Sequence, residues 1–229
     1  MQYKNIELEW LGHSGFKIKS SDLDRVIYID PFKISEESEA ADIIFITHSH
    51  QDHCSIEDLR KIVKPNTIII CSPDCQSKIS KINQMLDIKL VEPTDKMEFF
   101  ESKLKFWVVQ AYNIGKEFHT KEDYWNGYVL QLGDVRVYHA GDTDLIPEMK
   151  NLSSAGIDIA LLPMGGGFTM NAGEAAKAAS IIKPKIAIPM HYASISGVAD
   201  RSEANLFQKY CLQEGVEVKI LEQYKNDNI

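Results

Sequence analysis

The stretch Ile43-Ile44-Phe45-Ile46-Thr47-His48-Ser49-His50-Gln51-Asp52-His53 joins an apolar run to three histidines and an aspartate. The apolar run predicts a buried strand, and the polar residues begin where that strand ends. Because alternate residues of an extended segment point to the same side, His48 and His50 can bind one metal ion. Asp52 and His53 lie beyond the bend and can face a second ion. Imidazole and carboxylate groups bind Zn, Fe, Ni and Mn, so this stretch predicts a metal site.

The size and composition of the chain are those of an ordinary globular protein. It has 229 residues, of which 44% are hydrophobic and 25% charged, and we expect a single domain over residues 1–229. No segment approaches the roughly 18 consecutive apolar residues of a membrane span. The first residues lack the apolar core of an export signal. We therefore expect a cytoplasmic protein with no membrane partner.

The charge and the cysteines narrow the range of partners. The formal net charge is −8 and the basic residues are scattered, which disfavours nucleic acid and favours a small-molecule substrate. The four cysteines lack the spacing of a disulfide framework, and we expect Cys71 and Cys75 to be two reduced, partly buried thiols. A redox pair of Cys71 and Cys75 is the less favoured alternative. Homo-oligomerisation is left open by the sequence.

Strands and helices alternate around the histidine cluster. Ser55-x-x-Asp58 resembles a capping box and predicts a helix that ends near Val63, before Pro65. Another helix is predicted over Pro73 to Met85, where apolar residues recur at helical spacing. Apolar or alternating runs predict further strands at residues 6–11, 15–19, 26–29, 67–70, 103–109 and 128–132.

In the second half, three apolar strands each lead into a polar loop. Strands are predicted at 135–139, 157–162 and 185–189, and they lead to Asp142, to the glycines 165–167 and to His191. Ligands bind outside the carboxyl ends of strands in open α/β sheets, so these loops and His48 are expected to meet at one edge. The glycines fit a tight turn better than an anion-binding loop. A helix capped by Asn171-x-x-Glu174 links the last two strands.

These motifs together resemble the metallo-β-lactamase superfamily. The resemblance rests on His48-x-His50-x-Asp52-His53, Gly141-Asp142-Thr143 and Pro189-Met190-His191-Tyr192, each after a strand. Residues 10–14, 29–32 and 162–166 are also similar to the branch of metal-dependent hydrolases related to L-ascorbate-6-phosphate lactonase. The resemblance implies an α/β (α+β) fold, a four-layer αββα sandwich, with a metal centre at one edge.

The resemblance also implies a set of ligands. His48 and His50 would bind a first ion, Asp52, His53 and His191 a second, and Asp142 would bridge the two. Asp52 and Asp142 are the expected catalytic residues. The implied cofactor is a pair of divalent ions, with Zn favoured and Mn, Ni or Fe as alternatives.

One ligand of the family pattern is missing. Where the family has a histidine after the strand 105–109, this chain has Asn113. His119, further along the same loop, is the candidate replacement, and a solvent-exposed loop histidine is the alternative. His13 and His139 follow or end strands near the expected edge. Each either orients a ligand or the substrate, as Asn113 also can, or is a buried core histidine.

The expected activity is hydrolysis of a small ester, lactone or phosphoester by metal-activated water. A mononuclear iron oxygenase is the main alternative, because two histidines and a carboxylate form its usual site. A nuclease and a non-catalytic metal protein are less favoured. Substrate choice is expected to depend on loops 113–126 and 194–201. The aromatic residues that either line a pocket or pack these loops are Tyr112, Phe118, Tyr124, Trp125 and Phe168.

Overall fold

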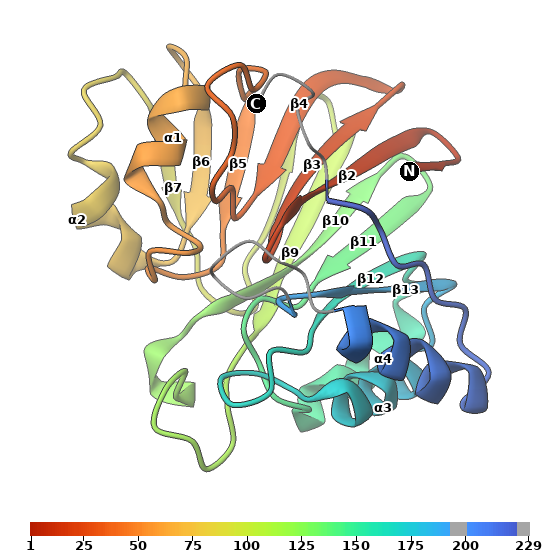
Figure 1. Ribbon diagram of the computed structural model, residues 1–229. Helices are drawn as coiled ribbons and strands as arrows, with labels where there is room; N and C mark the ends of the chain where they lie inside the picture. Colours follow the sequence, from red (N-terminus) through yellow and green to blue (C-terminus); the bar gives the residue numbers. More distant parts are fainter. Residues whose placement is uncertain (193–200, 224–229) are drawn as a thin grey trace.

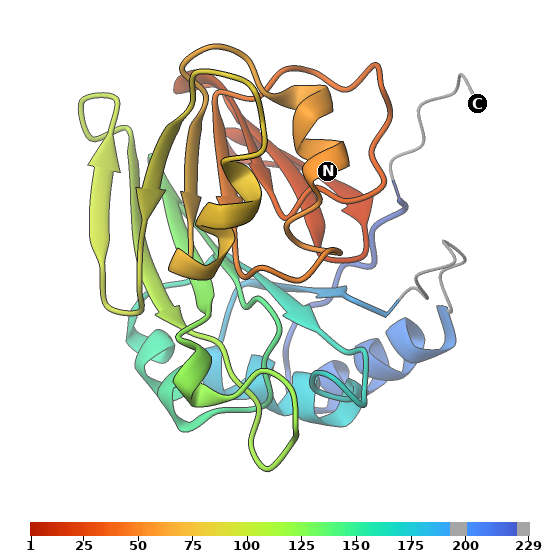
Figure 2. The same cartoon turned by 90° about the vertical axis from the view of Figure 1, so that its left-hand side faces the viewer.

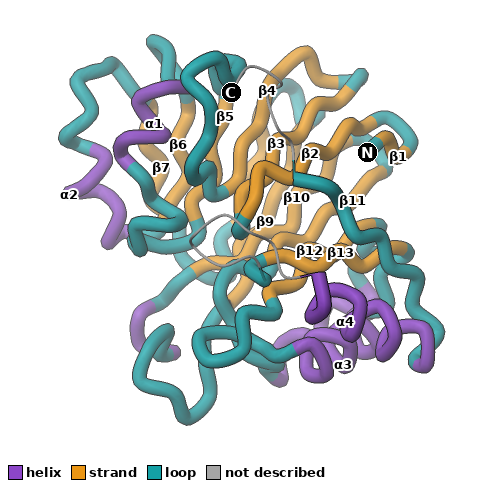
Figure 3. The backbone as a smooth tube through the Cα atoms, viewed as in Figure 1, coloured by secondary structure: helices purple, strands orange, loops and turns teal. Residues whose placement is uncertain are grey.

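The computed structural model describes residues 1–192 and 201–223, and it consists of two β-sheets packed face to face between two layers of helices (Figure 1). Figure 3 shows the strands in the middle of the molecule and the longer helices on two outer sides. The αββα sandwich expected from the sequence is confirmed. Part of the predicted loop 194–201 and residues 224–229 of the chain end lie outside the described residues.

The first sheet contains seven strands in chain order, from β1 to β7. Strands β1 to β4 are antiparallel neighbours, whereas β4 to β7 run parallel. The strands are β1 (Gln2–Tyr3), β2 (Ile6–Gly12), β3 (Gly15–Ser20), β4 (Leu23–Ile29), β5 (Ile43–Ile46), β6 (Ile68–Cys71) and β7 (Asp87–Leu90).

The second sheet has six strands in the order β13-β12-β11-β10-β9-β8. Like the first sheet, it combines antiparallel and parallel strands. Strands β8 to β11 are antiparallel neighbours, and β11 to β13 run parallel. The strands are β8 (Lys96–Phe99), β9 (Leu104–Gln110), β10 (Asn126–Leu132), β11 (Val135–His139), β12 (Ile159–Pro163) and β13 (Ile186–Met190).

Helices cover the outer face of each sheet (Figure 2). Two capping predictions are confirmed at their first turns: the Ser55 side chain accepts a hydrogen bond from the Asp58 amide, and Asn171 forms a complete capping box with Glu174. The first sheet is covered by α1 (Ile56–Ile62), η1 (Pro73–Cys75) and α2 (Gln76–Ile79), and the second by η3 (Pro147–Ser154), α3 (Ala172–Ile182) and α4 (Arg201–Gln213); η2 (Lys121–Asp123) lies in a loop.

Strand β5 is buried on both faces, which explains its unbroken apolar sequence. Ile43 and Phe45 face the core between the sheets, where the Phe45 ring lies 5.1 Å from the ring of Tyr128. Ile44 and Ile46 face the second apolar cluster, beneath α1. Because both faces are packed, the strand end that carries the histidines is held in a fixed position.

The predicted helix over Pro73 to Met85 is wrong in length, because only η1 and the single turn of α2 form. β7 runs parallel to β6 and its Asp87 pairs with Ile68, so the chain must return along the sheet before it starts β7. A 13-residue helix would use nearly all the residues available for that return, since a helix rises only about 1.5 Å per residue. Strands β1, β7 and β8 were not predicted. They lie at or next to the sheet edges, where half-exposed strands carry a weak apolar pattern.

The structure also describes the state of the cysteines and the apolar character of the helices. All four cysteines are buried free thiols, more buried than the sequence suggested. Among the described residues, no helix is long and apolar enough to cross a membrane.

Candidate metal centre

The loops after several strands of both sheets meet at one edge of the sandwich. Strands β5, β11 and β13 all run toward this edge, so that residues far apart in the chain lie within a few ångströms of one another. The predicted convergence is therefore observed for His48, Asp142 and His191. Donor atoms that all lie within 4.8 Å of one another belong to a first donor group, His48, His50 and His119, and to a second donor group, His13, Asp52, His53 and His191. A third set, His48, His53 and Asp142, joins these two groups.

The first group is formed by three imidazoles. The Nδ1 atom of His50 lies 3.1 Å from Nε2 of His48 and 3.3 Å from Nε2 of His119. His48 and His119 are buried, whereas His50 is partly exposed. The three nitrogens therefore point toward a common centre, and a metal ion bound there would be reached from the side of His50.

Asp142 lies between the two groups. Its Oδ1 atom is 3.4 Å from Nε2 of His53, and its Oδ2 atom is 3.1 Å from Nε2 of His191. The same Oδ2 atom is 3.5 Å from Nε2 of His119, a member of the first group. A single buried carboxylate thus faces imidazoles of both groups, as a bridging ligand would.

The separations within the cluster fit metal ligands better than hydrogen bonds. Two ligands at about 2.0–2.1 Å from one tetrahedral Zn lie about 3.3 Å apart, whereas a charge-assisted N–H···O bond is about 2.7–2.9 Å long. The contacts of Asp142 with the imidazoles, at 3.1 to 3.5 Å, fall in the first range. In addition, His53 Nε2 and Asp142 Oδ1 are buried and make no hydrogen bond. The side chains that are present therefore suit a bound cation.

The hydrogen-bond network turns the ring nitrogens of His53 and His48 toward the centre. Nδ1 of His53 lies 2.8 Å from Oδ2 of Asp30, and Thr47 donates to the same carboxylate through its hydroxyl group, at 2.6 Å, and its amide. The Thr47 hydroxyl oxygen is also 2.9 Å from Nδ1 of His48. These contacts place the ring protons on Nδ1 and leave the Nε2 lone pairs free for a metal.

Asp30 is thus a functional residue that the sequence interpretation missed. It is fully buried and directly follows β4, which ends at the same edge as β5. The sequence did contain a sign of this role, because Asp30 directly follows a predicted strand, as the predicted ligands do. Nothing local showed that it would support His53, 23 residues away.

His119 is buried in the cluster, so the alternative of a solvent-exposed loop histidine is wrong. Its Nδ1 atom lies 3.0 Å from the carbonyl oxygen of Phe168, which leaves Nε2 facing His50 and Asp142. Asn113 holds the loop and the ring of His119, because its Nδ2 atom lies 3.1 Å from Nδ1 of His119. Its side-chain NH₂ also donates to the carbonyls of Phe118 and Phe168 at 3.0 and 2.8 Å, and its backbone N–H donates to the carbonyl of His119.

The two other histidines named from the sequence have different environments. His139 is a buried core histidine whose Nε2–H donates to the carbonyl of Ser14 and whose Nδ1 accepts from the Gly141 amide. It supports the loop that carries Asp142 and does not contact a ligand directly. His13, in contrast, belongs to the second donor group.

The glycine loop is a tight turn, as the sequence favoured. Gly166 has a φ of +75°, and the amides of Gly165 and Gly166 donate within the loop, to Thr169 and Met170. A Cβ on Gly165 would lie 2.4 Å from Nδ1 of His191, so only glycine allows the loop to pass this imidazole. The loop leaves little backbone free to bind an anion.

Burial and the central carboxylate set the charges of the cluster. Burial lowers the pKa of His48, His50 and His119, which keeps these imidazoles neutral. Burial alone would raise the pKa of Asp142, but His191 and His53 outweigh it and hold that pKa well below its usual range. Burial alone would lower the pKa of His53 and of His191, but the same carboxylate outweighs it and raises both, so these two imidazoles hold a proton that a bound cation would replace.

Aromatic side chains surround the first group. The Trp125 ring lies 4.5 Å from the ring of His48 at an angle of 31°, and its Nε1–H donates to Asp74. Phe118 and Phe168 are about half exposed and their rings are 5.5 Å apart. Tyr112 instead packs its loop, because its ring is buried and its hydroxyl group donates to Glu148.

The fold and the edge cluster define the class of protein: an αββα sandwich whose histidines and aspartates gather at the strand ends as a metal centre. A family model described as a beta-lactamase superfamily domain matches residues 7–191. The chain is 33% identical over 205 residues to a UPF0173 metal-dependent hydrolase of Pyrococcus horikoshii, covering 82% of this chain and 84% of that protein. The chain belongs to this family of metal-dependent hydrolases in the β-lactamase superfamily.

Solved structures agree with this assignment. A protein of Parabacteroides distasonis, assigned as a metal-dependent hydrolase, superposes with a TM-score of 0.82 at 31% identity and covers 96% of this chain and 94% of its own. A diiron β-hydroxylase of Streptomyces venezuelae, CmlA, superposes with a TM-score of 0.75 at 14% identity, covering 97% of this chain and 54% of its own. The second likeness shows the shared fold alone.

Proposed function

We propose that the chain hydrolyses a small ester, lactone or phosphoester with the help of two divalent ions, and that these ions are Zn. The observation that carries this proposal is the position of Asp142, whose two carboxylate oxygens face imidazoles of both donor groups. One carboxylate shared between two imidazole groups suits two neighbouring cations rather than one. The assignment of the ions is therefore His48, His50 and His119 for the first, and Asp52, His53 and His191 for the second.

When bound, such a pair of cations lowers the pKa of water to roughly 7 and polarises the carbonyl or phosphoryl oxygen under attack. The protein holds the donors in place through Asp30, Thr47 and Asn113. Asp52 is the most exposed carboxylate of the cluster, at 25% of its side chain, so it can accept the proton of the attacking water.

A small substrate is supported by the surroundings of the cluster. The acidic net charge of −8 disfavours a polyanion such as nucleic acid. Lys116, which lies near the glycine loop, is already bound to Asp144 and to the carbonyls of Gly166 and Thr169. The half-exposed Phe118 and Phe168 offer an apolar surface beside the first group. A neutral ester or lactone fits this surface better than a phosphoester does.

A mononuclear iron oxygenase is the second candidate. The missing histidine at Asn113 kept this possibility open, but His119 supplies an imidazole to the first group. The first group is then three imidazoles rather than two imidazoles and a carboxylate. The hydrolase proposal accounts for the donors better.

The proposal is tested by metal removal and reconstitution. The chain is stripped with a chelator, reloaded separately with Zn, Mn, Ni or Fe, and its metal content is measured. Hydrolysis of p-nitrophenyl acetate, a γ-lactone and p-nitrophenyl phosphate is then followed. We expect about two ions per chain, no activity in the stripped protein, and recovery of ester or lactone hydrolysis on reloading.

Two variants sharpen this experiment. Asp52→Ala should reduce turnover by at least about 100-fold while the circular dichroism spectrum is unchanged. Asp24→Ala is the matched control, because Asp24 is an exposed aspartate distant in sequence from all the donors. Wild-type turnover in the Asp52 variant would exclude the assigned role. One Fe per chain together with oxygen uptake would favour the oxygenase instead.

A further inference from the structure

His13 is held at the metal edge by hydrogen bonds from residues of both sheets. It lies in the turn between β2 and β3 with a φ of +49°, a conformation that non-glycine residues seldom adopt. Its carbonyl oxygen accepts hydrogen bonds from the His191 amide and from Nε1 of Trp10, both 3.0 Å long. The backbone at His13 and the predicted ligand His191 are therefore fixed relative to each other.

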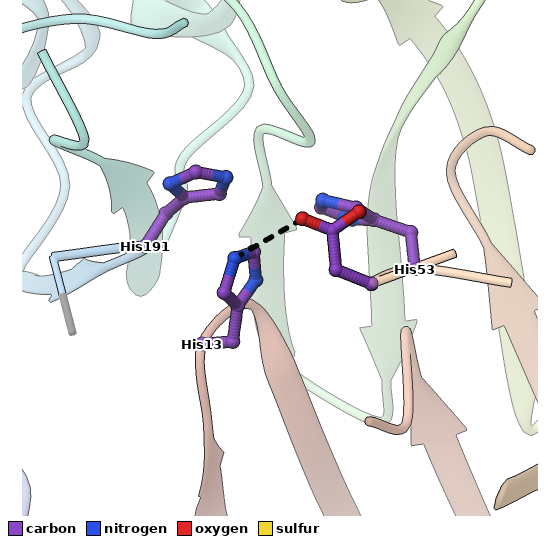
Figure 4. Close-up of side chains that lie close together, drawn as sticks. His13, His53 and His191 are labelled. Atoms are coloured by element: carbon purple, nitrogen blue, oxygen red, sulfur yellow. Dashed lines mark ion pairs between the residues drawn. The ribbon is translucent and has the colours of Figure 1, made fainter. Parts of the chain in front are cut away.

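The His13 ring points into the second donor group. Its centroid lies 4.1 Å from that of His191 and 5.4 Å from that of His53. Figure 4 shows the three rings, with the dashed contact from His13 to the carboxylate of Asp52. The side chain is only 7% exposed, and Nδ1 is buried without a hydrogen-bond partner. Nε2 is therefore the nitrogen that faces the carboxylate of Asp52, whereas both ring nitrogens of His139 are occupied by hydrogen bonds to the backbone.

The distance from Nε2 of His13 to Oδ2 of Asp52 is 3.3 Å. This is the separation expected for two donors on one tetrahedral ion, about 3.3 Å, and it is longer than a charge-assisted hydrogen bond. The contact between His53 and Asp30, at 2.8 Å, shows the length of a true imidazole–carboxylate hydrogen bond in the same cluster. The donor atom of His13 also lies within 4.8 Å of those of Asp52, His53 and His191.

We propose that His13 is a direct ligand of the second ion, which is then held by His13, Asp52, His53 and His191. The ligand set of the superfamily motifs does not contain this histidine. The inference shares one assumption with the proposed function, which is that a second ion binds at this edge. It also has a consequence for the reaction: with Asp142 shared by both ions, the second site has five protein donors and the first has four, so substrate is expected to approach at the first ion.

The experiment measures metal binding rather than hydrolysis. Zn is titrated into the stripped protein in competition with a chromophoric chelator, and bound Zn is counted per chain. The variants are His13→Ala, His13→Gln and His13→Asp, with Asp52→Ala as a change at another proposed ligand of the second ion and Asp24→Ala as the neutral control. Glutamine can form a hydrogen bond to Asp52 but is a poor Zn ligand, whereas aspartate can bind Zn.

In His13→Ala and His13→Gln, we expect the first Zn to bind as in the wild type and the second to bind more than about 100-fold more weakly. A residue that only supports a ligand costs about 10- to 100-fold. His13→Asp should recover part of the lost affinity. Wild-type affinity for the second Zn in His13→Gln would overturn the proposal, because a hydrogen bond to Asp52 would then be sufficient.

A measurement on the unmodified chain covers the case in which the variants fail to fold. Anomalous diffraction from Zn-loaded crystals gives the distance from the second ion to Nε2 of His13. A distance of about 2.0–2.1 Å supports the proposal, and one above about 3 Å overturns it. A chain that binds two Zn in this way but hydrolyses no ester, lactone or phosphoester would refute the proposed function and leave the role of His13 intact.

Discussion

Nδ1 of His53 lies 2.8 Å from Oδ2 of Asp30, and both side chains are completely buried. The same carboxylate accepts two hydrogen bonds from Thr47. The end of β4 therefore fixes the ring of a histidine that follows β5. A carboxylate behind a metal-bound histidine sets its tautomer and raises its basicity, so the position of Asp30 bears directly on how tightly the second ion is held.

Asp30→Asn should weaken binding of the second ion by about 10- to 100-fold. Asparagine tolerates the left-handed backbone that Asp30 adopts, with a φ of +43°, so the change alters charge with little backbone strain. Chelator competition measures the affinity, and circular dichroism checks the fold. Equal affinity in the variant and the wild type would show that the hydrogen bond to His53 has no influence on the ion.

Asn113→Ala should loosen the first ion selectively. The amide side chain joins the carbonyls of Phe118 and Phe168 and lies 3.1 Å from Nδ1 of His119. Without these bonds, His119 is less firmly positioned, and we expect about tenfold weaker binding of the first Zn with the second unchanged. Sequential Zn titration distinguishes the two sites. An equal loss at both sites would contradict a local role for Asn113.

Phe118 and Phe168 should select substrates with an apolar group. Both rings are about half exposed next to His119, and they contact each other edge to face at 5.5 Å. In the double alanine variant, we expect kcat/KM for p-nitrophenyl hexanoate to fall about tenfold, with p-nitrophenyl acetate little affected, because apolar contacts contribute about 1–3 kcal/mol to discrimination. Met85→Ala is the control, since Met85 is an exposed apolar residue outside the cluster. Equal losses for both esters would exclude selection by these rings.

Asp158→Asn should lower the free energy of unfolding by about 2 kcal/mol and the Tm by about 6 °C. Asp158 is buried and accepts hydrogen bonds from the Tyr3 hydroxyl at 3.0 Å, the Arg136 amide at 2.9 Å and the Lys185 ammonium at 2.7 Å. It thereby joins β1 to the second sheet, far from the metal edge. Chemical denaturation measures the change, and metal affinity should stay the same.

The stabilisation by Asp158 should depend on pH. Burial alone would raise the pKa of Asp158, but Lys185, the Arg136 amide and Tyr3 outweigh it and lower that pKa below the usual value. A carboxyl group with a lowered folded-state pKa stabilises the fold above its unfolded pKa of about 3.9, and this stabilisation is lost as the pH falls through the folded value. The difference in unfolding free energy between wild type and Asp158→Asn should be constant above about pH 5 and shrink below pH 4. A difference that grows on acidification would contradict this account.

Much of the site was readable from local patterns. The apolar run of β5 before His48, the capping residues Ser55 and Asn171, and the polar loops after β11 and β13 all follow from periodicity and turn chemistry. The resemblance to the superfamily then connected these segments to one fold. The failures have local causes too: the edge strands have weak apolar patterns, and the helix expected over Pro73 to Met85 was cut short by the return to β7.

The sequence by itself determined the fold class, the metal-binding character and most donors, because these depend on residue types at strand ends. Only the tertiary structure showed which groups Asp30, His13 and His119 contact. Each of these side chains acts through a partner on another strand or loop, at a distance set by how the two sheets pack. Sequence spacing fixes which side of a strand a residue faces, but it contains no measure of the gap between two loops that meet across the sandwich.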